Sequence, residues 1–341
     1  MMRRALLVGA GHMGRVWARN LGESSRVELV GWVDQRGDVV ATAANDLGLL
    51  DLHLDTDLAS ALKKTQPDFV VDVTIPAAHY AVTMLSLRAG IPVLGEKPMA
   101  TSMEHAREMV AEATRSGLLY MVSQNRRYNP QLGAFRQLIS AGTGPLAILN
   151  SDFYVGAREA GHRLEIASPL LLDIAIHAFD MARYLSGADP VAVYCEEFNP
   201  PWSWYRGNAS ASAIFEMTGG LRYNYRGSWC GEGRHTSWDS EWRGVGPHGS
   251  ATWGGTDAVP VADIVVERGG FLPVTEARHV EPRAMEPGIS GSLGDFLSAL
   301  DTGTPPMGAC HDNIKSLAMV FGAIESARCG KRVSCRSWLD A

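Results

Sequence analysis

Apolar runs alternate with stretches of helical spacing over the first 125 residues. The apolar runs predict strands at 4–11, 27–34, 68–75, 92–97 and 118–125. The helical patterns between them begin at Met13 and then cover 39–48, 56–64, 79–89 and 101–117. Continuous apolar strands that alternate with helices are typical of a parallel sheet covered on both faces. Residues 1–125 are therefore predicted to form a doubly wound α/β domain.

Short polar residues indicate where two of these helices begin. Thr56 or Asp57 is suited to cap the helix that follows it. Thr101 and Glu104 have the spacing of a capping box, and Gly117 is suited to end the same helix.

The pattern changes after residue 126. Helical spacing returns at 129–142, 170–187, 290–300 and 313–330. Short strands are predicted at 146–155, 191–198, 211–217, 221–229, 236–245, 249–255 and 262–268. Short strands joined by glycine-rich turns favour an open, mostly antiparallel sheet. Residues 126–341 are predicted to form a second, α+β domain.

The segment 170–187 is apolar on nearly every side of the predicted helix, yet it contains Asp173, His177 and Asp180. Burying an unpaired carboxylate is costly, so these groups need partners or a polar cavity. Asp173 and His177 lie four residues apart and share one helix face. They fit a buried structural pair, two metal ligands or acid–base machinery. Asp180 is expected to be structural, holding a neighbouring loop.

Composition narrows the function. The chain has 341 residues and a formal net charge of −6, which disfavours a nucleic-acid partner. No apolar run approaches the length of a membrane span, and the run after Arg3 and Arg4 is too short for a signal peptide. The five cysteines show no CxxC pair, so we expect neither a disulfide framework nor a metal site. A cytoplasmic location is expected.

The first predicted strand ends in a glycine loop. Gly9, Gly11 and Gly14 have G-x-G-x-x-G spacing, and Asp34 ends the second strand 20 residues after Gly14. In this context the loop is a dinucleotide fingerprint, in which free N–H groups at a helix start bind phosphates. A carboxylate at Asp34 favours a free ribose 2′-hydroxyl, and so NAD. Arg36 is placed to reach a 2′-phosphate, so NADP is not excluded.

Glu96, Lys97 and Pro98 lie at the carboxyl end of the strand 92–97, where ligands bind in doubly wound sheets. With this turn the chain resembles the glucose-fructose oxidoreductase / inositol dehydrogenase (Gfo/Idh/MocA) family. The matching segments are "GAGHMG", "VTIPAAHY", "GEKPMA", "QNRRYNP" and "LLLDIAIHAFDMARYLSG", followed by "FLSALDTGTPP" and "GAIESARCGKRV".

The resemblance implies a dehydrogenase that uses NAD(P) and acts on a sugar or cyclitol. It implies a catalytic set of Lys97, Asp173 and His177. The expected cofactor-binding residues are Gly9, Gly11, His12, Met13, Gly14, Asp34, Gln35, Arg36, Thr74, Ile75, Pro76, His79, Glu96 and Lys97. The resemblance also implies a homodimer or homotetramer formed through the second domain's sheet. The alternatives are a keto-sugar reductase that uses NADPH and a cofactor-binding regulatory protein without turnover.

The chemistry assigns roles to the catalytic set. Oxidation of a secondary alcohol removes a hydride from carbon and a proton from oxygen, and imidazole is a suitable base near neutral pH. We therefore expect His177 to be the base, Lys97 to stabilise the alkoxide and Asp173 to position the groups. Lys97 as the base remains open. Asp173 and His177 are expected to face Lys97 across a cleft that holds the nicotinamide.

Aromatic residues are concentrated between 202 and 253, and aromatic faces stack on sugars as well as packing in sheets. About half of this cluster is expected to serve packing or a dimer surface. Arg158 and His162 precede the 170–187 helix and are expected to close over the substrate. The expected substrate-binding residues are Lys97, Arg127, Tyr154, Arg158, Asp173, His177 and Trp204.

Overall fold

The computed structural model describes residues 2–158 and 161–339. Its internal contacts divide the chain into two compact units. The first unit takes residues up to Gln124 together with Ile289–Ile314, and the second takes the remainder. The second domain predicted at 126–341 therefore loses an internal segment to the first unit. The assignment of cofactor to one domain and substrate to the other stays a prediction.

Side-chain contacts explain why the segment after Gly288 joins the first unit. The ring of Phe296 packs against the ring of Phe69, and their centroids lie 5.3 Å apart. Asp301 accepts hydrogen bonds from Arg3 and Arg26, both at 2.9 Å. This segment therefore packs into the core of the first unit and forms ion pairs with residues on its surface.

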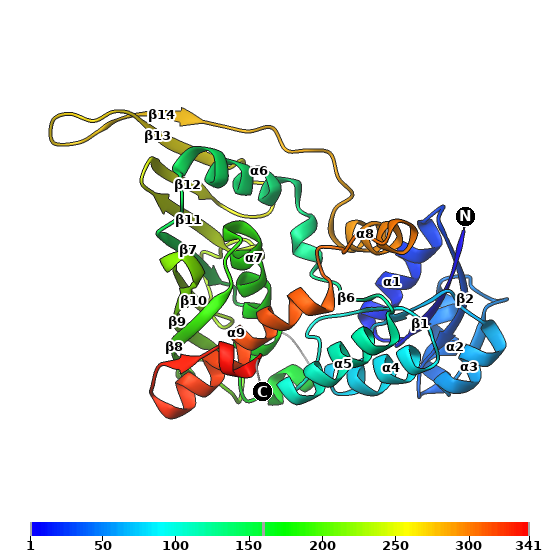
Figure 1. The fold of residues 1–341 in the computed structure, drawn as a ribbon. Coiled ribbons are helices and arrows are strands. Elements are labelled where there is room, and N and C mark those ends of the chain that lie inside the picture. The colour runs from blue at the N-terminus through cyan, green and yellow to red at the C-terminus, as the bar shows by residue number, and fades with distance from the viewer. Residues whose placement is uncertain (1, 159–160, 340–341) are drawn as a thin grey trace. The chain divides into compact units, whose positions relative to one another are not determined.

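The first unit alternates strands with helices, as the sequence predicts (Figure 1). Its elements are β1 (Arg3–Val8), α1 (His12–Glu23), β2 (Val27–Val33), α2 (Gly37–Asp46), β3 (His53–Asp55), α3 (Leu58–Thr65), β4 (Phe69–Asp72), α4 (Pro76–Arg88), β5 (Val93–Gly95), α5 (Met103–Ser116), β6 (Tyr120–Val122) and α8 (Gly288–Thr302).

Among the described residues these strands form one six-stranded parallel sheet, ordered β3-β2-β1-β4-β5-β6. The strand order reverses between β1 and β4, and ligands of doubly wound sheets bind beyond the strand ends at such a point. The predicted doubly wound fold is confirmed.

Two predictions in this unit are wrong in detail. The three-residue strand β3 was not predicted, because so short a segment carries no measurable periodicity. The capping residue of α5 is Ser102, whose side chain accepts from the N–H of His105, and not Thr101. Asp57 caps α3 through the N–H of Ser60, and Gly117 ends α5 in the left-handed conformation, both as predicted.

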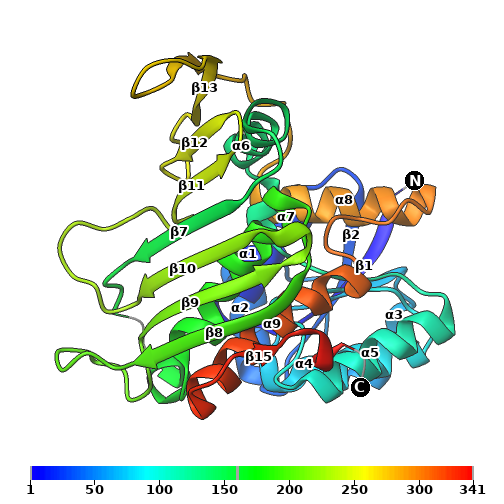
Figure 2. The ribbon, with the colours of Figure 1, turned by 60° about the vertical axis from the view of Figure 1, so that its left-hand side comes forward.

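The second unit combines helices with one large sheet (Figure 2). Its longer elements are α6 (Pro130–Leu138), β7 (Ile148–Tyr154), α7 (Ile176–Ser186), β8 (Pro190–Phe198), β9 (Ser210–Met217), β10 (Arg222–Ser228), β11 (Glu241–Gly246), β12 (Gly249–Trp253), β13 (Val261–Glu267), β14 (Val274–Arg278), most of α9 (Cys310–Cys329) and β15 (Val333–Ser334). Short helices lie at Asn125–Tyr128, Ile139–Thr143, Gly161–Glu165, Leu170–Ala175, Thr218–Gly220 and Arg336–Trp338.

The described strands of this unit form a nine-stranded sheet, ordered β14-β13-β12-β11-β7-β10-β9-β8-β15. Every pair is antiparallel except β7 with β10, so the predicted open and mostly antiparallel sheet is confirmed. One face of the sheet packs on α7, where Phe179 contacts the rings of Phe215 and Tyr225.

Three local predictions differ from the structure. The strand predicted at 236–245 begins only at Glu241, after a turn at 237–240. Strands β14 and β15 were not predicted, since one is exposed along its whole length and the other has two residues. The helix predicted at 170–187 begins as a π-helix over Leu170–Ala175 before α7 continues it.

Candidate active site

The glycine loop joins β1 to α1 with close backbone packing. A Cβ on Gly9, which has φ +102°, would lie 2.6 Å from the carbonyl oxygen of Val73, and one on Gly14 would lie 2.1 Å from that of Gly9. A Cβ on Gly11 would meet nothing within 4 Å. Gly11 is also the N-cap residue of α1, and no side-chain hydrogen bond caps the helix there. The loop therefore leaves open backbone at the start of α1, which suits a pyrophosphate.

Asp34 follows β2 and is tied to the same loop. Its two carboxylate oxygens accept hydrogen bonds from the N–H groups of Ala10 at 2.8 Å and Arg36 at 2.9 Å. The Arg36 guanidinium lies 3.8 Å from Asp34 and is largely exposed. The carboxylate is thus fixed beside the glycine loop, in the place that suits a ribose diol.

The turns after β4 and β5 bring several other expected residues together. His79 of α4 contacts the carbonyl oxygens of Thr74 and Pro98. Glu96 accepts a hydrogen bond from the indole of Trp17 at 2.8 Å and another from the N–H of Lys97 at 3.2 Å. Burial raises the pKa of Glu96, and its contacts with Trp17 and Lys97 oppose that rise. These contacts hold the backbone on both sides of Lys97.

The remaining expected cofactor residues line the start of α1, the turn after β2 and the start of α4. His12, Gln35 and Ile75 are exposed, whereas Met13 and Pro76 are half-buried. Asp72, which ends β4, was not expected at the site. Its buried carboxylate accepts hydrogen bonds from the N–H and hydroxyl of Thr74. An aspartate at the end of an apolar strand was the signal in the sequence.

The helix that contains His177 is buried, as predicted. His177 and Asp180 are 6% and 1% exposed, and the apolar residues around them are also buried. Asp173 lies in the π-helical turn before α7 and is half-buried. A π-turn closes its hydrogen bond over five residues and not four. The segment from Asp173 to His177 therefore crosses from a π-helical turn into an α-helix, whereas one α-helix was expected.

Arg163, which sequence reasoning missed, donates from Nε to Asp173 Oδ2 at 2.5 Å. Residues 206–208 hold the segment that connects Arg163 to the π-turn. The N–H groups of Arg206 and Asn208 donate to carbonyls of that segment at 3.1 and 2.8 Å. A Cβ on Gly207 would lie 2.1 Å from the carbonyl oxygen of Ile166, so only glycine fits.

Asp180 is structural in its contacts. Its two oxygens accept from Nε and Nη2 of Arg127 at 2.6 and 2.7 Å, and Oδ1 also accepts from Ser316 at 2.7 Å. Arg127 is 5% exposed, so this pair favours a structural role for Arg127 and not the expected contact with substrate. Its neighbour Arg126 is close enough to Asp173 to feel its charge. Burial lowers the pKa of Arg126, while Asp239, Tyr225 and Asp173 oppose this.

Two expected substrate residues lie together. The guanidinium of Arg158 lies 4.5 Å above the ring of Trp204 and donates to Glu232 at 2.7 Å. Tyr154 ends β7 and is 37% exposed. The side chain of His162 lies outside the part of the chain that the structure describes. Trp229, Trp242 and Trp253 are buried, so these three members of the aromatic cluster serve packing, one of the two roles expected for about half of it.

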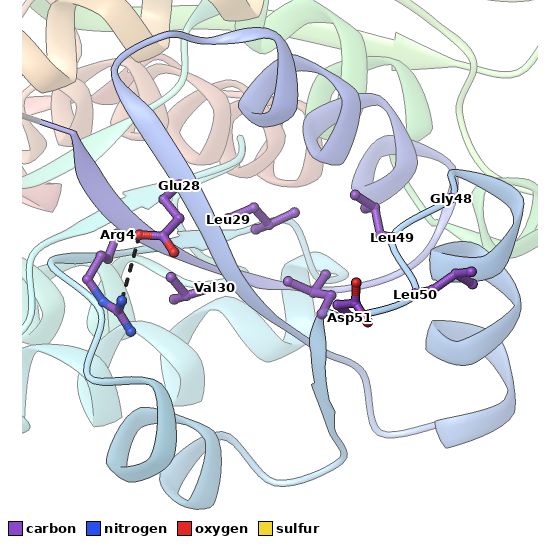
Figure 3. A pocket seen from close by; sticks show the side chains of 9 residues that line it. Arg4, Glu28, Leu29, Val30, Gly48, Leu49, Leu50 and Asp51 are labelled. Carbon is purple, nitrogen blue, oxygen red and sulfur yellow. Dashed lines mark ion pairs between the residues drawn. The ribbon is translucent and has the colours of Figure 1, made fainter.

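The described residues also form a pocket that none of the expected site residues lines. A pocket of about 440 Å³ is lined by Arg4, Glu28 and the loop 48–52 (Figure 3). It lies at the amino ends of β1 and β2, opposite the glycine loop.

Within residues 2–158 and 161–339, no group of three His, Cys, Asp or Glu side chains is suited to a metal, and no helix is long and apolar enough to span a membrane.

Lys97 belongs to the first unit, and Asp173 and His177 belong to the second. The expected cofactor residues all lie in the first unit, and Asp173 is tied to Arg163 in the second. That Lys97, Asp173 and His177 act on one substrate stays a prediction.

A glycine loop on a doubly wound sheet, followed by an α+β unit, defines an NAD-binding oxidoreductase. Residues 3–124 match the family model described as "Oxidoreductase family, NAD-binding Rossmann fold", and residues 132–252 match the "GFO/IDH/MocA C-terminal domain". The chain belongs to the Gfo/Idh/MocA family of oxidoreductases.

Relatives extend along the whole chain. Protein y4oX of Sinorhizobium fredii is 26% identical over 100% of this chain and 98% of its own. D-apiose dehydrogenase of Paraburkholderia graminis is 24% identical over 98% of this chain and 90% of its own. An oxidoreductase from Agrobacterium radiobacter, solved with NAD+, L-tartaric acid and magnesium, superposes with a TM-score of 0.85, at 18% identity and 99% coverage of both chains.

Proposed function

We propose that this protein is a dehydrogenase that oxidises a secondary or anomeric hydroxyl of a neutral sugar or cyclitol. The observation that carries the proposal is the tethered Glu96–Lys97–Pro98 turn at the carboxyl end of β5, in the same unit as the dinucleotide loop. An ammonium beside the site of a nicotinamide is suited to stabilise a developing alkoxide. Relatives named for sugar and inositol substrates support the substrate class.

His177 is the proposed base. It takes the proton from the substrate hydroxyl as the C–H bond gives up its hydride and the C=O bond forms. An imidazole needs little adjustment to act near neutral pH. Its position in a buried helix limits its motion, which favours a defined geometry with the hydroxyl.

Lys97 and Asp173 complete the set. Lys97 is proposed to hold the hydroxyl oxygen through its ammonium group. As a relay it gives one N–H proton to His177 and takes the hydroxyl proton in its place, so that His177 is the final acceptor. Asp173 is proposed to orient the hydroxyl or the imidazole, with its carboxylate held by Arg163. The nicotinamide ring, when bound, supplies the acceptor for the hydride.

The proposed cofactor is NAD, bound by the glycine loop and by Asp34. The carboxylate of Asp34 is fixed by two backbone N–H groups, so a 2′-phosphate would meet a charge that cannot move away. The guanidinium of Arg36 lies 3.8 Å from Asp34, so its charge is placed to offset part of that repulsion.

The test is hydride transfer in a single turnover, followed by the absorbance of the reduced nicotinamide. A panel of sugars and inositols with NAD and NADP first identifies the substrate. We expect His177→Ala and Lys97→Ala each to slow the transfer by about 100-fold or more. If both variants stay within about threefold of the unmodified chain, a difference of about 0.65 kcal/mol, the catalytic assignment is wrong.

Two substitutions serve as controls. Lys64→Ala removes an exposed lysine that pairs with Asp55, and His53→Ala removes a half-exposed histidine beside the same aspartate. Both are expected to leave hydride transfer unchanged. A chain that binds NAD tightly but turns over no polyol or keto-sugar would instead be a regulatory protein. Reduction of a keto-sugar with NADPH that is faster than the oxidation of any polyol with NAD would favour the reductase.

A further inference from the structure

His79 lies between two turns that converge at the carboxyl ends of β4 and β5. Its ring is 2% exposed. Nδ1 lies 2.8 Å from the carbonyl oxygen of Pro98, and Nε2 lies 3.0 Å from the carbonyl oxygen of Thr74. A backbone carbonyl oxygen only accepts hydrogen bonds, so each ring nitrogen must be the donor in its own contact.

A neutral imidazole cannot satisfy both contacts. It has one N–H donor and one bare nitrogen, which would place a lone pair against a carbonyl oxygen in one of the two contacts. The imidazolium form has two donors and satisfies both. Only the imidazolium form therefore makes a hydrogen bond in each of the two contacts.

A buried cation needs nearby negative charge. Asp72 and Glu96 are the carboxyl groups whose charge interacts with that of His79, from the ends of β4 and β5, and Lys97 is the other cation beside Glu96. Oδ2 of Asp72 is buried and has no hydrogen-bond partner in the described part of the chain. Burial raises the pKa of both carboxyls, and the charge of His79 opposes that rise in each.

We propose that His79 is a doubly protonated clamp that joins the Thr74 turn to the Lys97–Pro98 turn and so positions Lys97. His79 is then a positioning residue and not a contact to the cofactor. The role assigned to Lys97 rests on the proposed function. Glu96 binds the N–H of Lys97 on one side, and His79 binds the carbonyl of Pro98 on the other, so the backbone of Lys97 is held at both ends.

The protonation state is tested directly by NMR. Chain labelled with ¹⁵N-histidine is titrated from about pH 6.5 to 8.5, the range in which ordinary histidines lose their charge. The His79 signal is identified by its loss in His79→Gln, and His105 and His53 serve as internal references. We expect the spectrum at neutral pH to show a proton on both ring nitrogens of His79, as the two carbonyl contacts require. A bare ring nitrogen at neutral pH overturns the clamp.

The positioning role is tested by kinetics. Glutamine carries a single donor group, so His79→Gln keeps only one of the two contacts. We expect its kcat to fall at least tenfold, with little change in the KM for NAD. His105→Gln is the matched control, because His105 stacks on Tyr80 on the neighbouring helix and touches neither turn. A kcat within about threefold of the unmodified chain overturns the positioning role.

Chemical rescue separates the cation from a merely space-filling ring. His79→Ala opens a hole that added imidazole fits, and only imidazolium replaces both contacts. We expect the rescued rate, divided by that of the unmodified chain at each pH, to rise as the pH falls. Rescue that strengthens with rising pH contradicts the proposal. If the unmodified chain oxidises no polyol, the proposed function fails, whereas the NMR result still decides whether the clamp exists.

Discussion

The three glycines of the first loop have different physical reasons to be glycine. Gly9 needs its positive φ, and a side chain on Gly9 or Gly14 would strike backbone carbonyl oxygens within the chain. Gly11 has open space where its side chain would be. Nothing in the folded chain therefore requires glycine at position 11, and we propose that it serves a ligand that approaches the backbone there.

Gly11→Ala is expected to leave the free energy of unfolding nearly unchanged while weakening NAD binding by about tenfold, or about 1.4 kcal/mol. Gly14→Ala is expected to lower both the free energy of unfolding and the affinity for NAD, since its Cβ would overlap the carbonyl of Gly9. Gly22→Ala, also in α1 with open space around it, is the control and should add about 0.5–1 kcal/mol of stability. Urea unfolding and a titration with NAD measure the two quantities. Unchanged NAD affinity in Gly11→Ala would exclude contact there.

At the scale of elements, α7 shows how a helix that is apolar on nearly every side accommodates ionisable residues. Asp180 is deeply buried and fully engaged by Arg127 and Ser316. Such a pair contributes little compared with an apolar replacement, but removing one partner leaves an uncompensated buried charge. The pair therefore fixes α7 against the short helix at 125–128 and against α9.

Asp180→Asn is expected to lower the free energy of unfolding by about 3–5 kcal/mol, because it leaves Arg127 charged and buried. Asp301→Asn is the matched control. Asp301 also binds two cations, Arg3 and Arg26, but its side chain is 49% exposed and theirs are 30% and 42% exposed, so water screens the loss and the free energy of unfolding should change little. Chemical unfolding of both variants gives the comparison. Equal losses would show that burial does not set the cost.

The same helix shows what sequence patterns can and cannot predict. Burial of 170–187 followed from its apolar circumference, and Asp180 was correctly expected to be structural. The π-turn at Leu170–Ala175 was not predictable, because α- and π-helices bury similar sets of apolar residues. Arg163 was missed because its partner Asp173 lies ten residues away, across a connection without periodicity. Local spacing predicts elements, whereas side-chain pairs depend on tertiary packing.

At the scale of the whole molecule, the large sheet has a second face opposite α7. Ile214 lies on that face, between Tyr194 and Asn224 on the adjacent strands, and is 52% exposed. Phe198 on β8 is exposed to the same degree. Apolar side chains gathered on one exposed face are typical of an interface between proteins. We propose that copies of this chain associate through this face into a homodimer or homotetramer.

Ile214→Arg places a charge in the centre of that face, where it would be buried without a partner in an oligomer. We expect light scattering during gel filtration to show a smaller mass for Ile214→Arg than for the unmodified chain at equal concentration. Leu50→Arg is the control, because Leu50 is 74% exposed and belongs to the first unit, not to the large sheet. A variant that keeps the mass of an oligomeric parent would rule out this face as the interface, as would a parent that is monomeric at the highest concentration.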